Sequence, residues 1–278
     1  SRQQFTTFAV PSILTFLIIF LNTQLWAQQI QFNIEKTTDG AIFWVENKEY
    51  CEVSVKMNLE LRNMQLTEIL KDDIFIIPAL ATKYRLFEIR KQTQGKYGYS
   101  YKYTTTLGNV HIEKPDDTVY DLPFEKGKQF IVGQGYNGSF THQNEFALDF
   151  DMPFRTIVTA ARTGVVVAVV QHFTDNCLQD ACKQMGNKVI IAHTDGSFAT
   201  YVHLFYNGAL VKVGDSVKKG QHIALSGNTG YATGPHLHFS CFLPSFGKKE
   251  TFKTKFRINN GNEVVYLEEK NKYQKLYD

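Results

Sequence analysis

The residues best suited to chemistry in this chain are two closely spaced histidines, His236 and His238, within residues 234–240, which read Gly-Pro-His-Leu-His-Phe-Ser. In a β-strand alternate side chains face the same side, so the two imidazoles and Ser240 share one face while the leucine and the phenylalanine take the other. A single histidine is more often structural. Two imidazoles side by side on a strand with an apolar back favour a functional site.

A third candidate histidine lies in residues 200–204, which read Thr-Tyr-Val-His-Leu. The same alternation predicts that Val202 and Leu204 point into the core and that Tyr201 and His203 point outward. We therefore expect the imidazole of His203 to be available for chemistry.

Acidic candidates follow in residues 146–151, which read Phe-Ala-Leu-Asp-Phe-Asp. Alternation buries the apolar members Phe146, Leu148 and Phe150 and presents Asp149 and Asp151 on the opposite face. Both carboxylates are candidate metal ligands.

His142 stands seven positions before Asp149. An odd separation on a straight strand would place the two side chains on opposite faces, so the two can meet only if His142 lies in a loop or beyond a bulge. The turn-rich residues 135–140 favour a loop over residues 141–145. Glu145 in this loop is either a general base or a solvated side chain, and the second interpretation is favoured because a helical His-Glu-x-x-His motif is absent.

Two histidines and one aspartate with an open fourth position make a hydrolytic zinc site. Such a metal lowers the pKa of its water to about 7 and polarises a scissile carbonyl. The remaining histidines can then act as a proton carrier and as a stabiliser of the tetrahedral oxyanion.

Four segments together resemble the lysostaphin-type (LytM-type) zinc metallopeptidases, which cut peptide bonds in the stems and cross-bridges of bacterial peptidoglycan. These segments are residues 201–204, 211–221, 227–230 and 234–239. The likeness covers residues 121–245. An additional N-terminal β-domain makes the layout similar to secreted members of the family in Gram-negative bacteria.

The resemblance implies a role for each candidate residue. His142, Asp149 and His238 would bind Zn²⁺, while His203 and His236 would serve catalysis. It also favours Asp149 over the neighbouring aspartate as the ligand.

The chain departs from the family pattern in three places. The first histidine and the aspartate are usually four positions apart in the family, whereas they are seven apart here. This departure concerns the assignment of His142 as a ligand more than that of the other site residues. Arg155 stands where the family favours a glycine after the aspartate strand, which should alter a turn. The polar insert of residues 175–186 is longer than is typical and can reshape one wall of the cleft.

Tyr136 and Tyr201 are candidates to border a substrate groove, although a half-buried strand tyrosine is the commoner case.

The remaining histidines lie next to turn or surface signals and are interpreted as structural: His111, His172, His193 and His222.

The elements that must position these residues read almost entirely as strands after Gln28. Short apolar and β-branched runs are separated by Asp-Gly and Asn-Gly pairs, which tight hairpins prefer. The sequence therefore predicts an all-β protein with antiparallel sheets. We expect a small β-sandwich-like accessory domain over residues 28–120, a peptidase domain over 121–245 and a C-terminal β extension packed on it over 246–278.

Residues 1–27 resemble a secretory signal peptide, with Arg2 ahead of a nine-residue apolar run, Ile13 to Leu21, that only Thr15 interrupts, and the small residue Ala27 at a processing position. The run is well short of the roughly 20 residues that span a bilayer. We expect cleavage after Ala27, no stable membrane insertion afterwards, and a periplasmic or secreted protein. The alternative is an N-terminus that is retained in the membrane. Gln28 would follow the cut, which argues against a lipoprotein.

Composition excludes several classes of protein. The 278 residues carry 30 Lys and Arg against 27 Asp and Glu, a net charge of +3 that is too balanced for a nucleic-acid binder. With 43% hydrophobic residues the chain can bury a core.

In an oxidising compartment a local Cys177–Cys182 disulfide is compatible with the spacing, but the sequence does not choose among the pairings of Cys51, Cys177, Cys182 and Cys241.

The predicted function is a zinc metalloendopeptidase that cleaves peptide stems or cross-links of peptidoglycan by metal-activated water. The alternative is a non-catalytic relative that binds cell wall or activates another hydrolase, and it is less favoured because all five site positions are filled. The sequence leaves open which bond is cut, what the N-terminal domain does and the oligomeric state.

Overall fold

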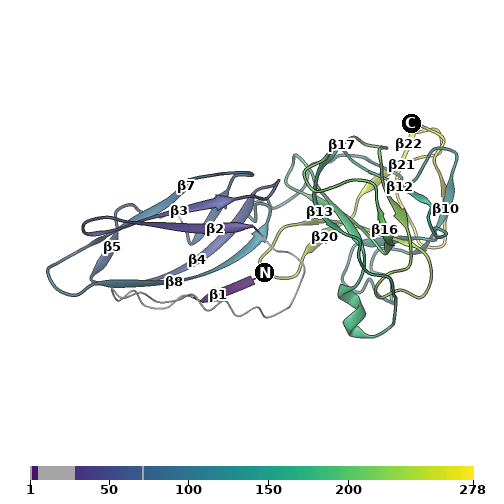
Figure 1. Ribbon diagram of the computed structural model, residues 1–278. Coiled ribbons are helices and arrows are strands. Elements are labelled where there is room, and N and C mark those ends of the chain that lie inside the picture. Colours follow the sequence, from purple (N-terminus) through teal and green to yellow (C-terminus); the bar gives the residue numbers. More distant parts are fainter. Residues whose placement is uncertain (1, 6–28, 71) are drawn as a thin grey trace. The chain divides into compact units, whose positions relative to one another are not determined.

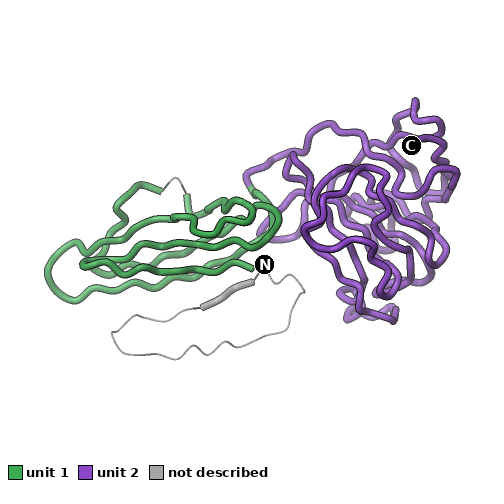
Figure 2. The backbone as a smooth tube through the Cα atoms, turned by 45° about the horizontal axis from the view of Figure 1, so that its top comes forward, with its two compact units in different colours: residues 1–110 green, residues 111–278 purple. Residues whose placement is uncertain are grey.

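The computed structural model of the chain describes residues 2–5, 29–70 and 72–278 (Figure 1). These residues form two compact units, residues 1–110 and 111–278 (Figure 2). The expected all-β class is confirmed, and no α-helix occurs in the described part of the chain. Among the same residues, no helix has the length and apolar character needed to cross a bilayer. The predicted signal peptide lies outside the described residues, apart from a strand at residues 2–5.

The first unit is built from two four-stranded antiparallel sheets, ordered β1-β8-β4-β6 and β2-β3-β7-β5. Their apolar faces meet in one core, where for example Phe32 of one sheet packs against Tyr103 of the other with ring centroids 4.3 Å apart. The alternation of buried and half-buried residues along residues 40–47 produces this two-faced sheet. The strands are β1 (Arg2–Phe5), β2 (Ile30–Lys36), β3 (Gly40–Asn47), β4 (Val53–Arg62), β5 (Met64–Leu66), β6 (Ile74–Ile77), β7 (Tyr84–Lys91) and β8 (Gly98–Leu107).

The second unit is organised around a nine-stranded sheet whose main order is β17-β13-β14-β15-β19-β11-β10-β23, with β20 also paired to β19. Two three-stranded sheets, β12-β18-β16 and β22-β21-β9, complete the unit. The strands are β9 (Tyr120–Asp121), β10 (Gln129–Gln134), β11 (Ala147–Phe150), β12 (Ile157–Thr159), β13 (Gly164–Val170), β14 (Lys188–Ala192), β15 (Phe198–Val202), β16 (Leu204–Ala209), β17 (Ser216–Val217), β18 (His222–Ser226), β19 (Leu237–Leu243), β20 (Glu250–Phe252), β21 (Lys255–Ile258), β22 (Glu263–Tyr266) and β23 (Lys272–Gln274).

One face of the large sheet closes the core of the second unit. Leu148, Val189, Tyr201 and Phe239 are all buried in this core. Because neighbouring residues on a strand point to opposite faces, their neighbours in sequence turn to the other face. That other face carries the candidate chemistry.

The polar insert of residues 175–186 contains a disulfide between Cys177 and Cys182. It also contains a short 3-10 helix, η1 (Asp180–Gln184). Cys51 and Cys241 are free thiols, half-buried and buried respectively. The sequence left this pairing open, and the short separation of the two bonded cysteines is what brings them together.

Candidate metal centre and flanking histidines

Cross-strand pairing brings the first two site residues together. Asp149 of β11 lies directly opposite His238 of β19 in the antiparallel register. Directly paired residues present their side chains on the same face of a sheet. The carboxylate Oδ1 of Asp149 therefore lies 3.0 Å from Nδ1 of His238.

The third residue, His142, reaches the site from the loop between β10 and β11, as expected from its odd separation from Asp149. The loop is a sequence of tight turns, in which the Glu145 amide donates to the His142 carbonyl. Although it is a loop residue, His142 is 1% exposed. Its Nδ1–H donates to the Gly135 carbonyl at 3.0 Å, which fixes the direction of the ring.

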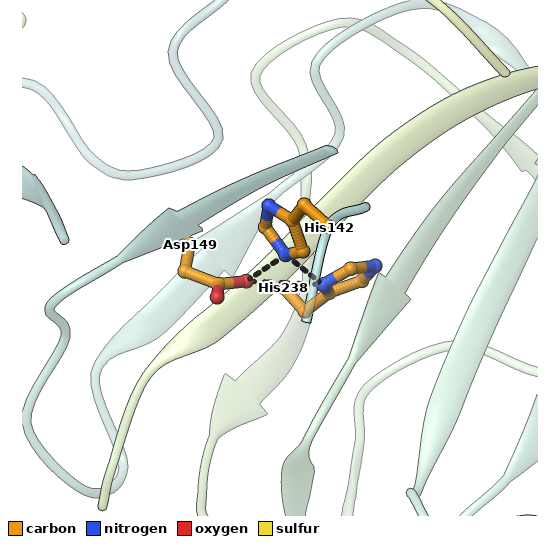
Figure 3. A group of neighbouring side chains, drawn as sticks. All are labelled: His142, Asp149 and His238. Atoms are coloured by element: carbon orange, nitrogen blue, oxygen red, sulfur yellow. Dashed lines mark hydrogen bonds and ion pairs between the residues drawn. The ribbon is translucent and has the colours of Figure 1, made fainter. Parts of the chain in front are cut away.

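Three potential ligand atoms converge at this point, as Figure 3 shows. Nε2 of His142 lies 3.2 Å from Oδ1 of Asp149 and 3.2 Å from Nδ1 of His238. Because Nδ1 of His142 carries the proton given to Gly135, Nε2 of the neutral ring has a lone pair. A carboxylate oxygen and ring nitrogens turned toward one another in this way are stabilised by a cation between them.

The donor set fits a divalent transition metal. Nitrogen and carboxylate oxygen are the ligands of catalytic zinc, and a tetrahedral ion with bonds of roughly 2.0–2.1 Å holds its donors roughly 3.3 Å apart. The three atoms here are separated by 3.0 to 3.2 Å. The site is thus a His-Asp-His metal-binding triad made of His142, Asp149 and His238.

The electrostatics of the triad are strongly coupled. Burial alone would raise the pKa of Asp149, but hydrogen bonds with His142 and His238 outweigh it and hold the pKa well below the usual range. Burial opposes protonation of His142, yet the hydrogen bond with Asp149 raises its pKa on balance. The carboxylate is therefore ionised and ready to bind a cation.

Two supporting residues were not singled out as such from the sequence. The side-chain amide of Gln134 donates to Oδ2 of Asp149 at 3.2 Å, and Gln134 pairs with Asp149 in the β10–β11 register. Oε1 of Glu145 lies 3.8 Å from Nε2 of His238, so Glu145 faces a triad histidine instead of being only a solvated side chain. Groups that orient ligands from outside the coordination sphere tune the metal. No local signal in the sequence indicates Gln134, because its place beside Asp149 follows from the β10–β11 register.

Two further histidines flank the triad. The rings of His203 and His236 lie 4.5 Å apart between centroids, and the ring of His203 lies 5.9 Å from that of His238. The Nδ1–H of His203 donates to the Thr229 carbonyl at 2.7 Å, and that of His236 donates to the Gly234 carbonyl at 2.8 Å. Both rings therefore keep Nε2 available as a proton acceptor when neutral. His236 Nε2 lies 3.9 Å from Oδ1 of Asp149.

His203 is placed by an unusual backbone. It lies between β15 and β16 with φ of 62°, a left-handed conformation that side chains other than glycine seldom adopt. Burial, and after it the neighbouring His236 and His238, lower the pKa of His203 to about 3. Backbone strain of this kind concentrates at functional sites.

The predicted face of residues 200–204 was wrong in part. Tyr201 is buried in the core, where its hydroxyl accepts the Ala161 amide at 2.8 Å, while Val202 lies opposite His238 on the site face. The left-handed residue at position 203 breaks the strand alternation, so His203 and Tyr201 do not share a face. Tyr201 cannot border a substrate groove.

The other candidates have structural contacts. Tyr136 donates to the Thr254 carbonyl at 3.1 Å. Asp151 lies beyond the end of β11 and is exposed, which leaves Asp149 as the aspartate of the triad. His193 is buried and bonded to the Thr163 carbonyl, and the exposed His222 lies 3.2 Å from Glu125.

Comparison with known families places this geometry in context. Residues 143–249 match the model of peptidase family M23. Four of the five site residues fall inside this match, and His142 stands immediately before it. The structure therefore supplies the assignment of His142, since its Nε2 is what completes the triad.

Three similar proteins illustrate the relationship. An uncharacterized metalloprotease of Buchnera aphidicola subsp. Baizongia pistaciae is 30% identical over 213 residues, covering 72% of this chain and 53% of that protein. Peptidoglycan DD-endopeptidase ShyA of Vibrio cholerae is 43% identical over 95 residues, 34% of this chain and 19% of that protein. The catalytic domain of lysostaphin from Staphylococcus simulans is 31% identical, covering 45% of this chain and 87% of that domain, with a TM-score of 0.34. The chain thus spans about half the length of the Buchnera protein and less of ShyA.

Proposed function

The chain belongs to peptidase family M23 and carries the metal-binding triad of a metalloendopeptidase in His142, Asp149 and His238, and from this premise we propose that it is a zinc-dependent endopeptidase that cleaves stem peptides or cross-links of bacterial peptidoglycan. The observation that carries the proposal is the triad itself. Three donor atoms from a loop and two strands meet within 3.2 Å, and two further imidazoles stand beside them. A purely structural role would not require this concentration of histidines.

Zinc is the proposed metal because the ligands are two imidazoles and a carboxylate, the donors of catalytic zinc sites. When bound, the ion would supply Lewis-acid polarisation of the scissile carbonyl and a water of lowered pKa. The chain's own contribution is to hold the ligands: Gly135 fixes the ring of His142, and Gln134 binds the outer oxygen of Asp149.

His203 and His236 are proposed to handle protons and charge. Each ring is locked by its Nδ1–H bond to a backbone carbonyl, so each presents Nε2 in a fixed direction. One Nε2 would take a proton from the attacking water and return it to the leaving amine, and the other, when protonated, would donate to the carbonyl oxygen as it gains negative charge. The positions of both rings, close to each other and to His238, support these roles.

The proposed substrate is peptidoglycan because ShyA, which is similar to this chain, is named a peptidoglycan DD-endopeptidase. Such a substrate lies outside the cytoplasmic membrane, so we place the protein in the periplasm or outside the cell.

The test is digestion of purified sacculi and of defined cross-linked muropeptides by the purified chain, with and without added Zn²⁺, and with product masses measured. Release of peptides that depends on the metal supports the proposal, and the masses identify the bond that is cut. Binding to sacculi without peptide release would contradict it and would favour a non-catalytic cell-wall protein.

A further inference from the structure

The backbone carbonyl that positions His203 belongs to Thr229, and Thr229 is itself tightly held. Its hydroxyl donates to the Leu204 carbonyl at 2.9 Å and accepts the Asn187 amide at 2.9 Å. Leu204 directly follows His203 in the chain. Thr229 therefore holds the histidine in two ways. Its carbonyl accepts the Nδ1–H of His203, and its hydroxyl donates to the carbonyl of the next residue, Leu204.

The next residue, Gly230, lies between two segments of the insert that the disulfide joins. These segments are residues 175–177, the first arm, and residues 182–186, the second arm. Its amide donates to the Asp175 carbonyl at 2.9 Å, and its carbonyl accepts the Cys177 amide at 3.0 Å. On the other side, a Cβ at Gly230 would lie 2.6 Å from the Gly186 nitrogen and 3.1 Å from the Cys182 oxygen. One cysteine thus belongs to each arm that grips Gly230.

The second arm also lies next to residues 202 and 203. A Cβ at Gly186 would lie 2.8 Å from Cγ1 of Val202 and 3.8 Å from Nδ1 of His203. Gly186 therefore leaves free the space beside Val202 and beside the same ring nitrogen that Thr229 binds.

The insert buries few of its side chains. Most side chains in residues 174–185 are exposed, and the only one buried in its short helix is Cys182. A segment that buries so little apolar surface gains little from packing, so the covalent link between its arms adds to the hydrogen bonds that hold it to Gly230 and Ala232.

We propose that the Cys177–Cys182 disulfide holds the Thr229 carbonyl in place, and through it the imidazole of His203. The disulfide thereby raises kcat and does not contribute to metal binding. We call this role the brace. The inference rests on the proposed function, because the turnover concerned is that of peptidoglycan peptides. Thr229 and the insert are positioning elements. The described contacts of the triad run to Gln134, Gly135, Glu145, His203 and His236, and none of them runs to the insert.

The experiment compares the parent with a Cys177→Ser/Cys182→Ser variant and with Cys51→Ser, a matched control that removes a thiol from the other unit. The measurements are kcat and KM on a cross-linked muropeptide, bound metal, and hydrogen exchange of the Gly230 amide by NMR. We expect the double variant to lose roughly 10- to 100-fold in kcat, since a displacement of about 1 Å can cost as much. Metal content and KM should be unchanged, exchange at Gly230 should be faster, and the control should match the parent.

Parent-like kcat together with parent-like exchange in the double variant would overturn the brace. The exchange measurement separates this from failure of the proposed function, because it reports on the hold of the insert on Gly230 even if the parent releases no peptide. If the double variant does not fold, Thr229→Val and Thr229→Ser replace it. The valine lacks the hydroxyl bonded to Leu204 and should lower kcat, the serine should restore it, and equal rates for both would overturn the inference.

Discussion

Nε2 of His142 lies 3.2 Å from Nδ1 of His238, although 96 residues separate them in the chain. The ring of His142 comes from a loop and is held by its hydrogen bond to the Gly135 carbonyl. The ring of His238 comes from β19, which is held by its pairing with β11. Two independently supported elements thus deliver ring nitrogens to one point. This arrangement lets the metal bind without a large rearrangement of the backbone.

Replacing His142 with alanine should abolish stable metal binding, because the two remaining triad ligands leave a zinc site incomplete. Metal content after dialysis against a weak chelator would measure the effect. His222→Ala removes an exposed histidine that is outside the triad and should retain the metal. Equal metal in the two variants would remove His142 from the ligand set.

Gln134→Glu should weaken metal binding by about 10- to 100-fold, the usual effect of altering a group that orients a ligand. The change keeps an acceptor for the loop amides of Phe140 and Thr141 but places a carboxylate against Oδ2 of Asp149. Competition with a fluorescent zinc chelator would give the affinity. Gln143→Glu adds the same charge in the exposed part of the loop and should bind zinc like the parent.

His203→Ala and His236→Ala should keep the metal and lose roughly 10²- to 10⁴-fold in kcat/KM, the range for loss of a group that transfers protons. Neither ring belongs to the triad, although both lie beside it. Muropeptide digestion and metal analysis on the same preparations would test this. Digestion at the parent rate by both variants would contradict the catalytic roles.

Stability should fall as the pH is lowered from about 6.5 to 4 because of His193. Burial lowers the pKa of this histidine to about 4 from its ordinary value of 6.5. Between these values the unfolded chain binds the proton and the folded chain does not, so acid favours unfolding, by an amount on the order of 3 kcal/mol. Denaturant unfolding across this range would measure the slope.

The control for that titration is His193→Asn, which keeps an N–H donor for the Thr163 carbonyl and does not titrate. The variant should show a shallower slope of unfolding free energy between pH 6.5 and pH 4. Identical slopes in the parent and the variant would assign the pH dependence to other groups.

Tyr201→Phe should lower the free energy of unfolding by about 1–3 kcal/mol, the cost of leaving a buried amide without a partner. The hydroxyl accepts the Ala161 amide in the core, far from any role in substrate binding. Catalytic constants of the folded variant should be unchanged. Tyr206→Phe, at an exposed position, should unfold like the parent, and a raised KM in Tyr201→Phe would instead return this residue to the substrate groove.

Much of the fold could be predicted from the sequence because its signals are local. Alternation of apolar residues, together with Asp-Gly and Asn-Gly turns, indicated strands, and strands imply an all-β protein. The same alternation placed Leu237 and Phe239 in the core and the two histidines of that segment on the opposite face, as the structure confirms. Alternation failed at residues 200–204, since one left-handed residue there changes the direction of the chain.

The sequence by itself determined the chemical inventory: paired histidines on a strand, an aspartate on another strand, and a loop histidine that had to leave the strand alternation to be useful. Only the tertiary structure decided that their potential ligand atoms meet at one point, which aspartate takes part, and which carbonyls and amides orient them. It also decided that Cys177 forms a disulfide with Cys182 and that the insert closed by this disulfide hydrogen-bonds to Gly230. The physical reason is that facing on a strand follows from the period of the backbone, whereas convergence depends on strand register and loop closure, which are set by contacts between residues far apart in the chain.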